Sequence, residues 1–300
     1  MISIIICSIN AQNLAKLKVN IKETIGVPFE LIAIDNSKTS KGICRVYNQG
    51  AQQAKFPVLC FVHEDVLFAT LNWGRNICEH LSDKQTGLLG LAGGDSKSRV
   101  PSSWSIPIKS NEINIYQHYK REKKEPMHIV ETSPGNASKK RVVALDGVFL
   151  CTRKDVFEQF QFDEKTFTGF HGYDIDFSLQ VNTKYNNYVI FDIVVHHFSD
   201  GTPDKKWIES AKLISNKWKK ALPVSIYPLA EAEANLYHWK SLQVFLQKLF
   251  ELKYPLPIIF QNYLVYSFNQ YFTVRRFVSM GKYVFLSSLK KPNSLGRNFN

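Results

Sequence analysis

Residues 2–9 (ISIIICSI) are a continuous run of apolar, mostly β-branched residues. Such a run is typical of a strand that is buried on both faces, as in sheets covered by helices on both sides. Three further apolar runs follow, at 30–36, 58–63 and 86–94. Helix-forming stretches separate the runs, at 11–25, 40–55 and 72–83. This alternation predicts an α/β domain with a doubly wound, mostly parallel sheet.

Composition agrees with one large domain, or with a catalytic domain that carries a smaller appendage. The 300 residues are 44% apolar and 21% charged, which supports a sizeable core and excludes a disordered or fibrous chain. The 38 Lys and Arg against 26 Asp and Glu give a net charge of +12. An anionic partner is therefore expected, such as a phosphorylated small molecule or an anionic membrane surface. Nucleic acid is not expected, because no RNP-like or helix-turn-helix pattern is present.

The cysteines and the N-terminal residues predict the compartment. Five cysteines lie inside apolar runs with no CxxC pair, which predicts buried, reduced thiols in a cytosolic protein: Cys7, Cys44, Cys60, Cys78 and Cys151. The first residues lack the basic region of a signal peptide, and no run reaches the ~18 apolar residues of a spanning helix. We expect a cytoplasmic protein, at most peripheral at the inner face of a membrane.

The strand pattern is interrupted at 95–141, where four prolines and the run KREKKE at 120–125 predict an irregular excursion beside the crevice. The pattern resumes at 142–151 (VVALDGVFLC). Further helices and one strand are expected after it: helices at 153–160, from 174 to about 185 and at 204–220, and a strand at 188–195 that delivers His196 and His197.

Polar residues stand where the first three apolar runs end. In open α/β sheets the ligand lies beyond the carboxyl ends of the strands. Ser8 ends the first run, Asp35 and Asn36 end the second, and His63-Glu64-Asp65 ends the third. We therefore expect these acid and amide clusters to surround one crevice.

Asp65 is the first candidate for chemistry at this crevice. A carboxylate there could cap the next helix. It stands, however, in the same predicted sheet as the strand that ends in His196 and His197. A carboxylate oxygen, an imidazole nitrogen and diphosphate oxygens suit Mn²⁺ or Mg²⁺. Such a metal would neutralise charge on a leaving diphosphate.

Asp174 and Asp176 form a second candidate pair, at a predicted helix start. Two residues apart, they cannot share one helical face, so we expect separate roles. Asp174 could project into the crevice as a general base, whereas Asp176 lies where a carboxylate meets the helix dipole favourably. The alternative is that both carboxylates serve only the helix N-terminus.

Four more residues are candidates for donor binding. Arg45 and Asn48 lie on the helix after the second strand, where they reach a pyrophosphate or a base, or else form a solvated face. Asp146 and Gly147 interrupt an apolar strand, which indicates a bulge or the close approach of a ligand. Two tryptophans are either sugar-stacking platforms or packing anchors: Trp73 and Trp104.

The order of these motifs resembles the family 2 glycosyltransferases over residues 1–222. The motifs are IDNS, GICRVYNQGAQQA, LCFVHEDV, ALDGVFLCTRKDVF, FHGYDIDFSLQV and VVHHFSDGT. Within that family the chain is most similar to the subgroup that resembles the streptomycin-biosynthesis glycosyltransferase domain. The resemblance implies a GT-A fold, a nucleotide-sugar donor, a divalent metal and inversion at the anomeric carbon.

Carried over by position, the resemblance assigns roles to single residues. His63-Glu64-Asp65 stands where the family has Asp-x-Asp, so Asp65 would bind the metal, with His196 as a further ligand and His197 as the less favoured option. Tyr173 replaces the first acid of the family's Glu-Asp pair, which leaves Asp174 as the general base. Together with the strand-end residues, the expected donor-binding set is Ser8, Asp35, Asn36, Arg45, Asn48, His63, Glu64, Asp146 and Gly147.

Residues 223–300 differ from the rest of the chain. Positions 224–300 hold nine Lys or Arg and three Glu, and no acidic residue follows Pro255. We interpret this segment as a basic, aromatic-rich helical extension. The favoured role is a lid or a homodimer contact whose aromatic residues form a core. The alternative is a cationic platform on anionic lipid, which would suit a lipid-linked acceptor.

We expect an inverting glycosyltransferase that moves a sugar from a nucleoside-diphosphate donor to a hydroxyl in glycan or polysaccharide synthesis. The acceptor could be a glycan, a lipid-linked molecule or a small molecule. A non-catalytic GT-A-like module that holds a nucleotide sugar or a glycan is the alternative. A Rossmann-type dehydrogenase or methyltransferase is disfavoured, because SINAQN follows the first strand where a Gly-x-Gly-x-x-Gly turn would be needed.

Overall fold

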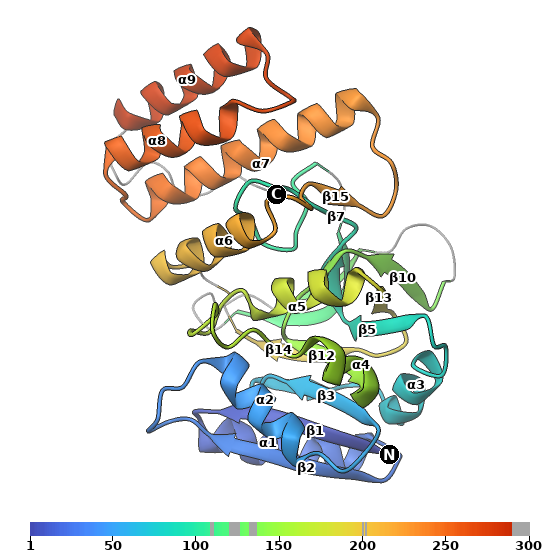
Figure 1. Cartoon of the computed structure of the whole chain (residues 1–300). Helices are drawn as coiled ribbons and strands as arrows, with labels where there is room; N and C mark the ends of the chain where they lie inside the picture. The colour runs from blue at the N-terminus through green and yellow to red at the C-terminus, as the bar shows by residue number, and fades with distance from the viewer. Residues whose placement is uncertain (109–110, 120–126, 132–136, 200, 202, 290–300) are drawn as a thin grey trace.

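The structure is a computed structural model that describes residues 1–108, 111–119, 127–131, 137–199, 201 and 203–289. It contains two large sheets, helices that flank them, and a group of three helices at the C-terminal end (Figure 1).

A seven-stranded sheet forms the centre of the N-terminal part of the molecule, in the order β10-β13-β5-β12-β3-β1-β2. Its strands are β1 (Ile2–Ser8), β2 (Phe29–Asp35), β3 (Val58–Val62), β5 (Thr86–Gly90), β10 (Lys139–Val142), β12 (Phe149–Arg153) and β13 (Asn186–Ile190). The α/β class is confirmed, but the sheet is mixed. Strand β12 runs antiparallel to both β3 and β5, because it follows a turn at Asp146 and Gly147 and no helical crossover precedes it.

Helices cover both faces of this sheet. The first face carries α1 (Ala11–Thr24) and α3 (Trp73–His80), and the other carries α2 (Ile43–Gln53), α4 (Lys154–Phe160) and α5 (Tyr173–Asn182). Because successive side chains of a strand point to opposite faces, Ile4 and Ile6 belong to the first core and Ile5 to the second. The continuous apolar run 2–9 is thus explained by burial on both sides.

A second sheet replaces part of the irregular excursion predicted for 95–141. Its order is β11-β6-β8-β14-β4, and β9 pairs with β8. Its strands are β4 (Val66–Phe68), β6 (Ala92–Gly94), β8 (Glu112–His118), β9 (Met127–Glu131), β11 (Ala144–Leu145) and β14 (Val195–Phe198). The prediction was wrong for β8, whose Ile113 and Ile115 alternate with polar residues. The run KREKKE at 120–125 lies outside the described residues.

The cysteine prediction also needs a correction. Cys60 of β3 and Cys151 of β12 stand directly opposite each other in the antiparallel pair, and the structure joins them as a disulfide. Their separation of 91 residues hides this pairing in the sequence. Cys7, Cys44 and Cys78 are free thiols.

The C-terminal part begins with α6 (Lys205–Lys217) and β15 (Val224–Ser225), which pairs with β7 (Ser96–Lys97). Helices α7 (Glu231–Glu251), α8 (Leu256–Ser267) and α9 (Val274–Leu289) follow and share a core of their own. Val100, which follows β7, and Ile208 of α6 also join that core. Figure 1 shows these helices at the end of the molecule farthest from β1 and β2. None of the helices that the structure describes has the length and apolarity needed to cross a bilayer.

Candidate active site

A cleft of about 1170 Å³ opens where β1, β2 and β3 end and β12 begins, between the sheet and helices α5, α6 and α7. Seven of the predicted site residues line it: Asn36, His63, Glu64, Asp65, Asp146, Gly147 and Asp174. Five do not: Ser8, Asp35, Arg45, Asn48 and His196. Several residues at the strand ends therefore border one cleft, whereas the five residues of the second list do not line it.

Three side chains in the cleft form a group that could hold a metal ion. His63, Asp65 and His197 each offer one ligand atom, and these atoms all lie within 4.8 Å of one another. The Nε2 atom of His197 is 3.8 Å from Oδ1 of Asp65. His63 and Asp65 follow β3, and His197 stands on β14 in the second sheet, so the group joins the two sheets.

A hydrogen-bond chain fixes the tautomer of His63. The hydroxyl of Tyr173 donates to the carbonyl of Gly147 at 2.9 Å, and it also lies 2.7 Å from Nε2 of His63. Because that hydroxyl has only one proton, Nε2 of His63 must be the donor in the second bond. The lone pair of Nδ1 then stays free for a ligand. Burial also lowers the pKa of His63, which keeps the imidazole neutral.

A second chain fixes the tautomer of His197. The side-chain amide nitrogen of Gln117, on β8, donates to the carbonyl of Ser199, so its Oε1 faces Nδ1 of His197 at 3.1 Å. An amide oxygen only accepts, and Nδ1 of His197 is therefore the donor. This leaves the lone pair of Nε2 on the side of Asp65. Both imidazoles thus present one free lone pair each.

The structure does not bring His196 to this group. Its ring stacks on Tyr116 at 4.8 Å between centroids, and its Nδ1 lies 2.9 Å from Nε2 of His118. Neighbouring residues of a strand point to opposite faces, so only one of His196 and His197 can face Asp65. The distance of 3.8 Å between Nε2 of His197 and Oδ1 of Asp65 shows that His197 is the one that does. The structure therefore groups His197, and not the preferred His196, with His63 and Asp65.

Asp174 lies in the first turn of α5 with its carboxyl group buried. Gly172 precedes the helix with a φ of 87°, a left-handed conformation that favours glycine. The Oδ2 atom of Asp174 accepts the N–H of Gly147 at 3.1 Å. Burial, and then the nearby charge of Asp146, raises the pKa of Asp174 to about 7, although backbone N–H groups oppose the shift. A carboxylate with this pKa is suited to accept a proton near neutral pH.

Asp146 and Gly147 shape the floor of the cleft beside Asp174. The carboxylate of Asp146 accepts the indole N–H of Trp104 at 2.6 Å and the backbone N–H of Val148 at 2.9 Å. A Cβ atom on Gly147 would lie 2.0 Å from the hydroxyl oxygen of Tyr173. Only glycine therefore allows the contact that orients Tyr173. The interruption of the apolar strand is explained by this close approach.

A hydrogen bond between Ser8 and Glu64 joins the end of β1 to the residues that follow β3. The hydroxyl of Ser8 donates to Oε2 of Glu64 at 2.6 Å, and the backbone N–H groups of Ile9 and Asn10 donate to the same carboxylate. Glu64 therefore fixes the turn between β1 and α1. Asn36, which also borders the cleft, bonds the carbonyl of Lys41 through its Nδ2 at 2.8 Å and so holds the loop that follows β2.

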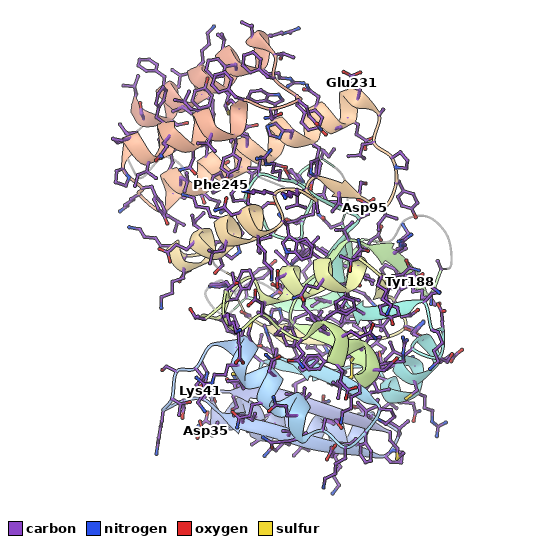
Figure 2. All side chains as sticks on the ribbon, in the orientation of Figure 1. Asp35, Lys41, Asp95, Tyr188, Glu231 and Phe245 are labelled. Atoms are coloured by element: carbon purple, nitrogen blue, oxygen red, sulfur yellow. A yellow bond between two sulfur atoms is a disulfide. The ribbon has the colours of Figure 1, made fainter. Side chains whose placement is uncertain are left out.

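The remaining predicted donor-binding residues lie elsewhere. The buried amide of Asn48 donates to the carbonyl of Phe162 at 2.9 Å and accepts its N–H, so it anchors a loop that is remote in sequence. Arg45 is exposed on α2 outside the cleft. Asp35 is also exposed and accepts the N–H of Ser37 (Figure 2). None of these three side chains borders the cleft, so the structure does not bring them together with the other predicted donor-binding residues.

Asp176 and Trp73 have structural roles. Asp176 is buried and binds the ammonium of Lys217 at 2.8 Å and the indole of Trp218 at 2.8 Å, so it ties α5 to α6. This agrees with the separate roles expected for Asp174 and Asp176. Trp73 is fully buried and stacks on Phe68, which makes it a packing anchor.

Helix α6 and the extension together form one wall of the cleft. Lys206 and Trp207 of α6 line it together with Val244, Phe245 and Lys248 of α7. Figure 2 shows Phe245 on the side of α7 that faces α6. The part of the expected lid that reaches the cleft is therefore α7.

Sequence reasoning missed Gln117 and the positioning role of Tyr173. Gln117 gave no signal, because its strand was expected to be irregular. Tyr173 was noted only as a departure from an acid. The hydrogen bond between Tyr173 and His63 shows that the two departures from the acidic motifs are physically coupled.

Residues 3–221 match the sequence profile of a family described as a glycosyltransferase like family. No curated protein matches the chain. Among solved structures, residues 1–349 of TarS from S. aureus with UDP-GlcNAc superpose with a TM-score of 0.54 at 13% identity, covering 92% of this chain and 82% of that one. At this identity the likeness shows a shared fold.

Two further structures have lower scores. The mannosyltransferase PcManGT from Pyrobaculum calidifontis with GDP-Man and Mn²⁺ gives a TM-score of 0.48 at 13% identity, covering 96% of this chain and 86% of that one. GalNAc-T7 with UDP, GalNAc and Mn²⁺ gives 0.46 at 12% identity and covers 66% of this chain. This chain spans 44% of the length of GalNAc-T7.

Proposed function

This chain belongs to the glycosyltransferase-like family, and we propose that it transfers a sugar, with inversion, from a nucleoside-diphosphate donor to a hydroxyl group of its acceptor. The observation that carries the proposal is the convergence of two features on one cleft. One is the group His63, Asp65 and His197, and the other is the buried carboxyl group of Asp174.

Asp174 is the proposed general base. Its carboxylate takes the proton of the acceptor hydroxyl as the oxygen attacks the anomeric carbon and the nucleoside diphosphate leaves with the bonding electrons. The pKa of about 7 makes the carboxylate a stronger base than an exposed aspartate, while leaving a large ionised fraction near neutral pH. The backbone N–H of Gly147 orients the carboxylate.

The metal group fits a divalent cation. Nδ1 of His63, Nε2 of His197 and a carboxylate oxygen of Asp65 supply two nitrogens and one oxygen, a mixed set that suits Mn²⁺ better than Mg²⁺. Bound there, the ion would supply Lewis-acid stabilisation to the departing diphosphate. Tyr173 and Gln117 hold the two rings in the required tautomers.

We assign the finer features on the order of the motifs. They support the subgroup that resembles the streptomycin-biosynthesis domain and a role in glycan or polysaccharide synthesis. Residues 1–222 form the proposed transferase unit, and 223–300 form an accessory unit that contributes α7 to the cleft.

A thermal-shift screen tests the donor half of the proposal. The full chain is heated with UDP, GDP and other nucleoside diphosphates, with and without Mn²⁺. A ligand that binds only the folded state at 100 times its dissociation constant stabilises that state by about 2.7 kcal/mol. We expect one diphosphate to raise the melting temperature only when Mn²⁺ is present. No shift with any of them would contradict the proposal.

Donor hydrolysis without acceptor tests the catalytic half. A transferase is expected to release the nucleoside diphosphate slowly from its sugar donor, with dependence on Mn²⁺ and on Asp174. Tight donor binding with no turnover, in the presence of a panel of acceptors, would instead identify a binding module.

A further inference from the structure

Helices α8 and α9 turn large apolar side chains toward the outside of the molecule. The exposed large apolar side chains of the described residues number nine in 1–255 and eleven in 256–289. On α9 the exposed residues Val274, Val278, Phe285 and Leu289 are spaced so that they form one stripe along the helix. Phe285 and Leu289 are 62% and 66% exposed.

The inner side of the same helices packs into the core shared with α7, through Ile259 and Tyr263 of α8 and Met280 and Val284 of α9. Asn262 and Ser267 of α8 and Ser287 of α9 are buried, whereas Phe260 and Val265 of α8 are exposed. A helix that is apolar around its circumference is typical of a buried position. The outer side therefore carries apolar side chains of the kind that proteins usually bury against another surface. Contiguous apolar surface of this kind marks an interaction site.

Exposed cations lie on the same helix as the apolar stripe of α9. Arg275, Arg276 and Lys282 of α9 are exposed, and no Asp or Glu occurs anywhere in residues 252–300. A two-fold homodimer through this face would bring the same cations of two copies together, with no acid in the segment to neutralise them. Anionic headgroups would neutralise them, and the boundary with the acyl chains would accept the apolar side chains.

We propose that this surface binds an anionic membrane. The α8–α9 face is defined as the exposed side chains Phe260, Val265, Phe268, Val274, Arg275, Arg276, Val278, Lys282, Phe285 and Leu289. Its apolar members enter the boundary between headgroups and acyl chains, and its three cations contact the lipid phosphates. The proposal does not depend on the proposed transferase activity.

The α8–α9 face lies on helices that also pack on the cleft wall. Leu242 and Leu246 of α7 are buried in the core that α7 shares with α8 and α9, and Val244 and Lys248 of the same helix line the cleft. A membrane bound by α8 and α9 is therefore one helix away from the cleft. This arrangement would suit an acceptor carried by a lipid.

Vesicle sedimentation of the full chain tests the proposal. We expect the protein to sediment at low salt with vesicles of phosphatidylcholine that contain phosphatidylglycerol, and to stay in solution with phosphatidylcholine alone. At about 1 M salt, where screening acts beyond about 3 Å, the electrostatic part of binding should be lost. Protein that stays in the supernatant with the anionic vesicles at low salt would overturn the proposal.

Two variants that remove the same number of positive charges from different helices locate the binding surface. Arg275→Gln/Arg276→Gln/Lys282→Gln should weaken binding on the order of 100-fold, because each cation near an anionic surface contributes about fivefold. The control is Lys16→Gln/Lys18→Gln/Lys22→Gln, which removes the same charge from exposed positions of α1. The control should bind like the unchanged protein. Equal loss in both variants would show that binding is unspecific and would overturn the assignment.

A third variant tests the apolar contribution and the competing occupant. Phe285→Ser/Leu289→Ser should reduce vesicle binding at least tenfold while the melting temperature stays near that of the unchanged protein. Sedimentation-velocity ultracentrifugation is run on both proteins without lipid, where we expect monomers. A dimer that dissociates in the variant would show that a second copy covers the face and would contradict membrane binding.

Discussion

The cleft and the α8–α9 face differ in how their side chains are held. In the cleft, three polar side chains are each oriented by a partner: His63 by Tyr173, His197 by Gln117 and Asp174 by the N–H of Gly147. On the α8–α9 face, Phe285 and Leu289 are exposed and large. The first surface is organised for directional chemistry, and the second for contact with a medium that has no fixed geometry. The difference predicts that single polar changes matter in the cleft, whereas charge and apolar area matter on the face.

The largest effect is expected from Asp174→Asn. Removal of a general base should lower the transfer rate about 10²–10⁴-fold, measured by release of nucleoside diphosphate with saturating donor and acceptor. Asp35→Asn is the matched control, because Asp35 is exposed outside the cleft. It should leave the rate unchanged. Transfer that survives in Asp174→Asn would exclude Asp174 as the base.

The same substitution should change how stability depends on pH. The pKa of Asp174 in the folded state is about 7, above the value near 4 of an unfolded aspartate. Folding therefore favours the protonated form, and this stability, up to about 4 kcal/mol, is present below pH 4 and lost as pH rises through 7. Denaturant unfolding at pH 8 should find Asp174→Asn more stable than the unchanged protein. A less stable variant at pH 8 would contradict the burial of the charge.

Substitution of the neighbouring residues His197 and His196 distinguishes the proposed metal ligand from the residue that packs on Tyr116. His197→Ala should lower Mn²⁺-dependent activity by at least about 100-fold, because loss of a ligand should exceed the 10–100-fold effect of losing a residue that orients one. His196→Ala, one residue away, should keep the metal dependence, since its ring packs on Tyr116. Activity is measured against Mn²⁺ concentration. The reverse order of effects would restore His196 as the ligand.

Gln117→Leu tests the orientation of His197. The change keeps the size of the side chain but removes the acceptor for Nδ1–H, and it should weaken Mn²⁺ binding about 10–100-fold in calorimetric titration. Gln117→Glu retains an acceptor oxygen and should recover most of the affinity. If both variants bind Mn²⁺ like the unchanged protein, Gln117 has no positioning role.

The smallest effect is expected on the α8–α9 face. Phe285→Ser should change the free energy of unfolding by no more than about 0.5 kcal/mol, as is usual for exposed positions. Leu246→Ala, in the core below, should cost about 2–5 kcal/mol because it opens a cavity. A large loss of stability in Phe285→Ser would show that the side chain packs against protein.

The sequence predicted the features of the fold that follow from local patterns, namely the buried strands and the polar residues at their ends. The run 2–9 and the later apolar runs predicted the buried strands. The rule on strand ends predicted one crevice beside Asn36, His63, Glu64 and Asp65, and these four residues line the cleft. The irregular interpretation of β8 failed because its short alternation lies between prolines and a charged run.

The remaining errors concern register and distant contacts. Whether His196 or His197 faces Asp65 depends on how β14 of the second sheet lies beside the residues that follow β3, which no pattern in the sequence states. Asn48 was assigned to the donor because its partner, the loop at Phe162, lies 114 residues away. Sheet pairing and distant hydrogen bonds therefore require coordinates.

The central claim is that His63, Asp65 and His197 hold one divalent cation in the cleft. Its most direct test is anomalous X-ray diffraction from crystals grown with Mn²⁺ and the nucleoside diphosphate selected by thermal shift. We predict a single manganese peak bonded to Nδ1 of His63, a carboxylate oxygen of Asp65 and Nε2 of His197. A peak bound by His196, or a nucleotide in the cleft with no manganese beside these three side chains, would contradict the account.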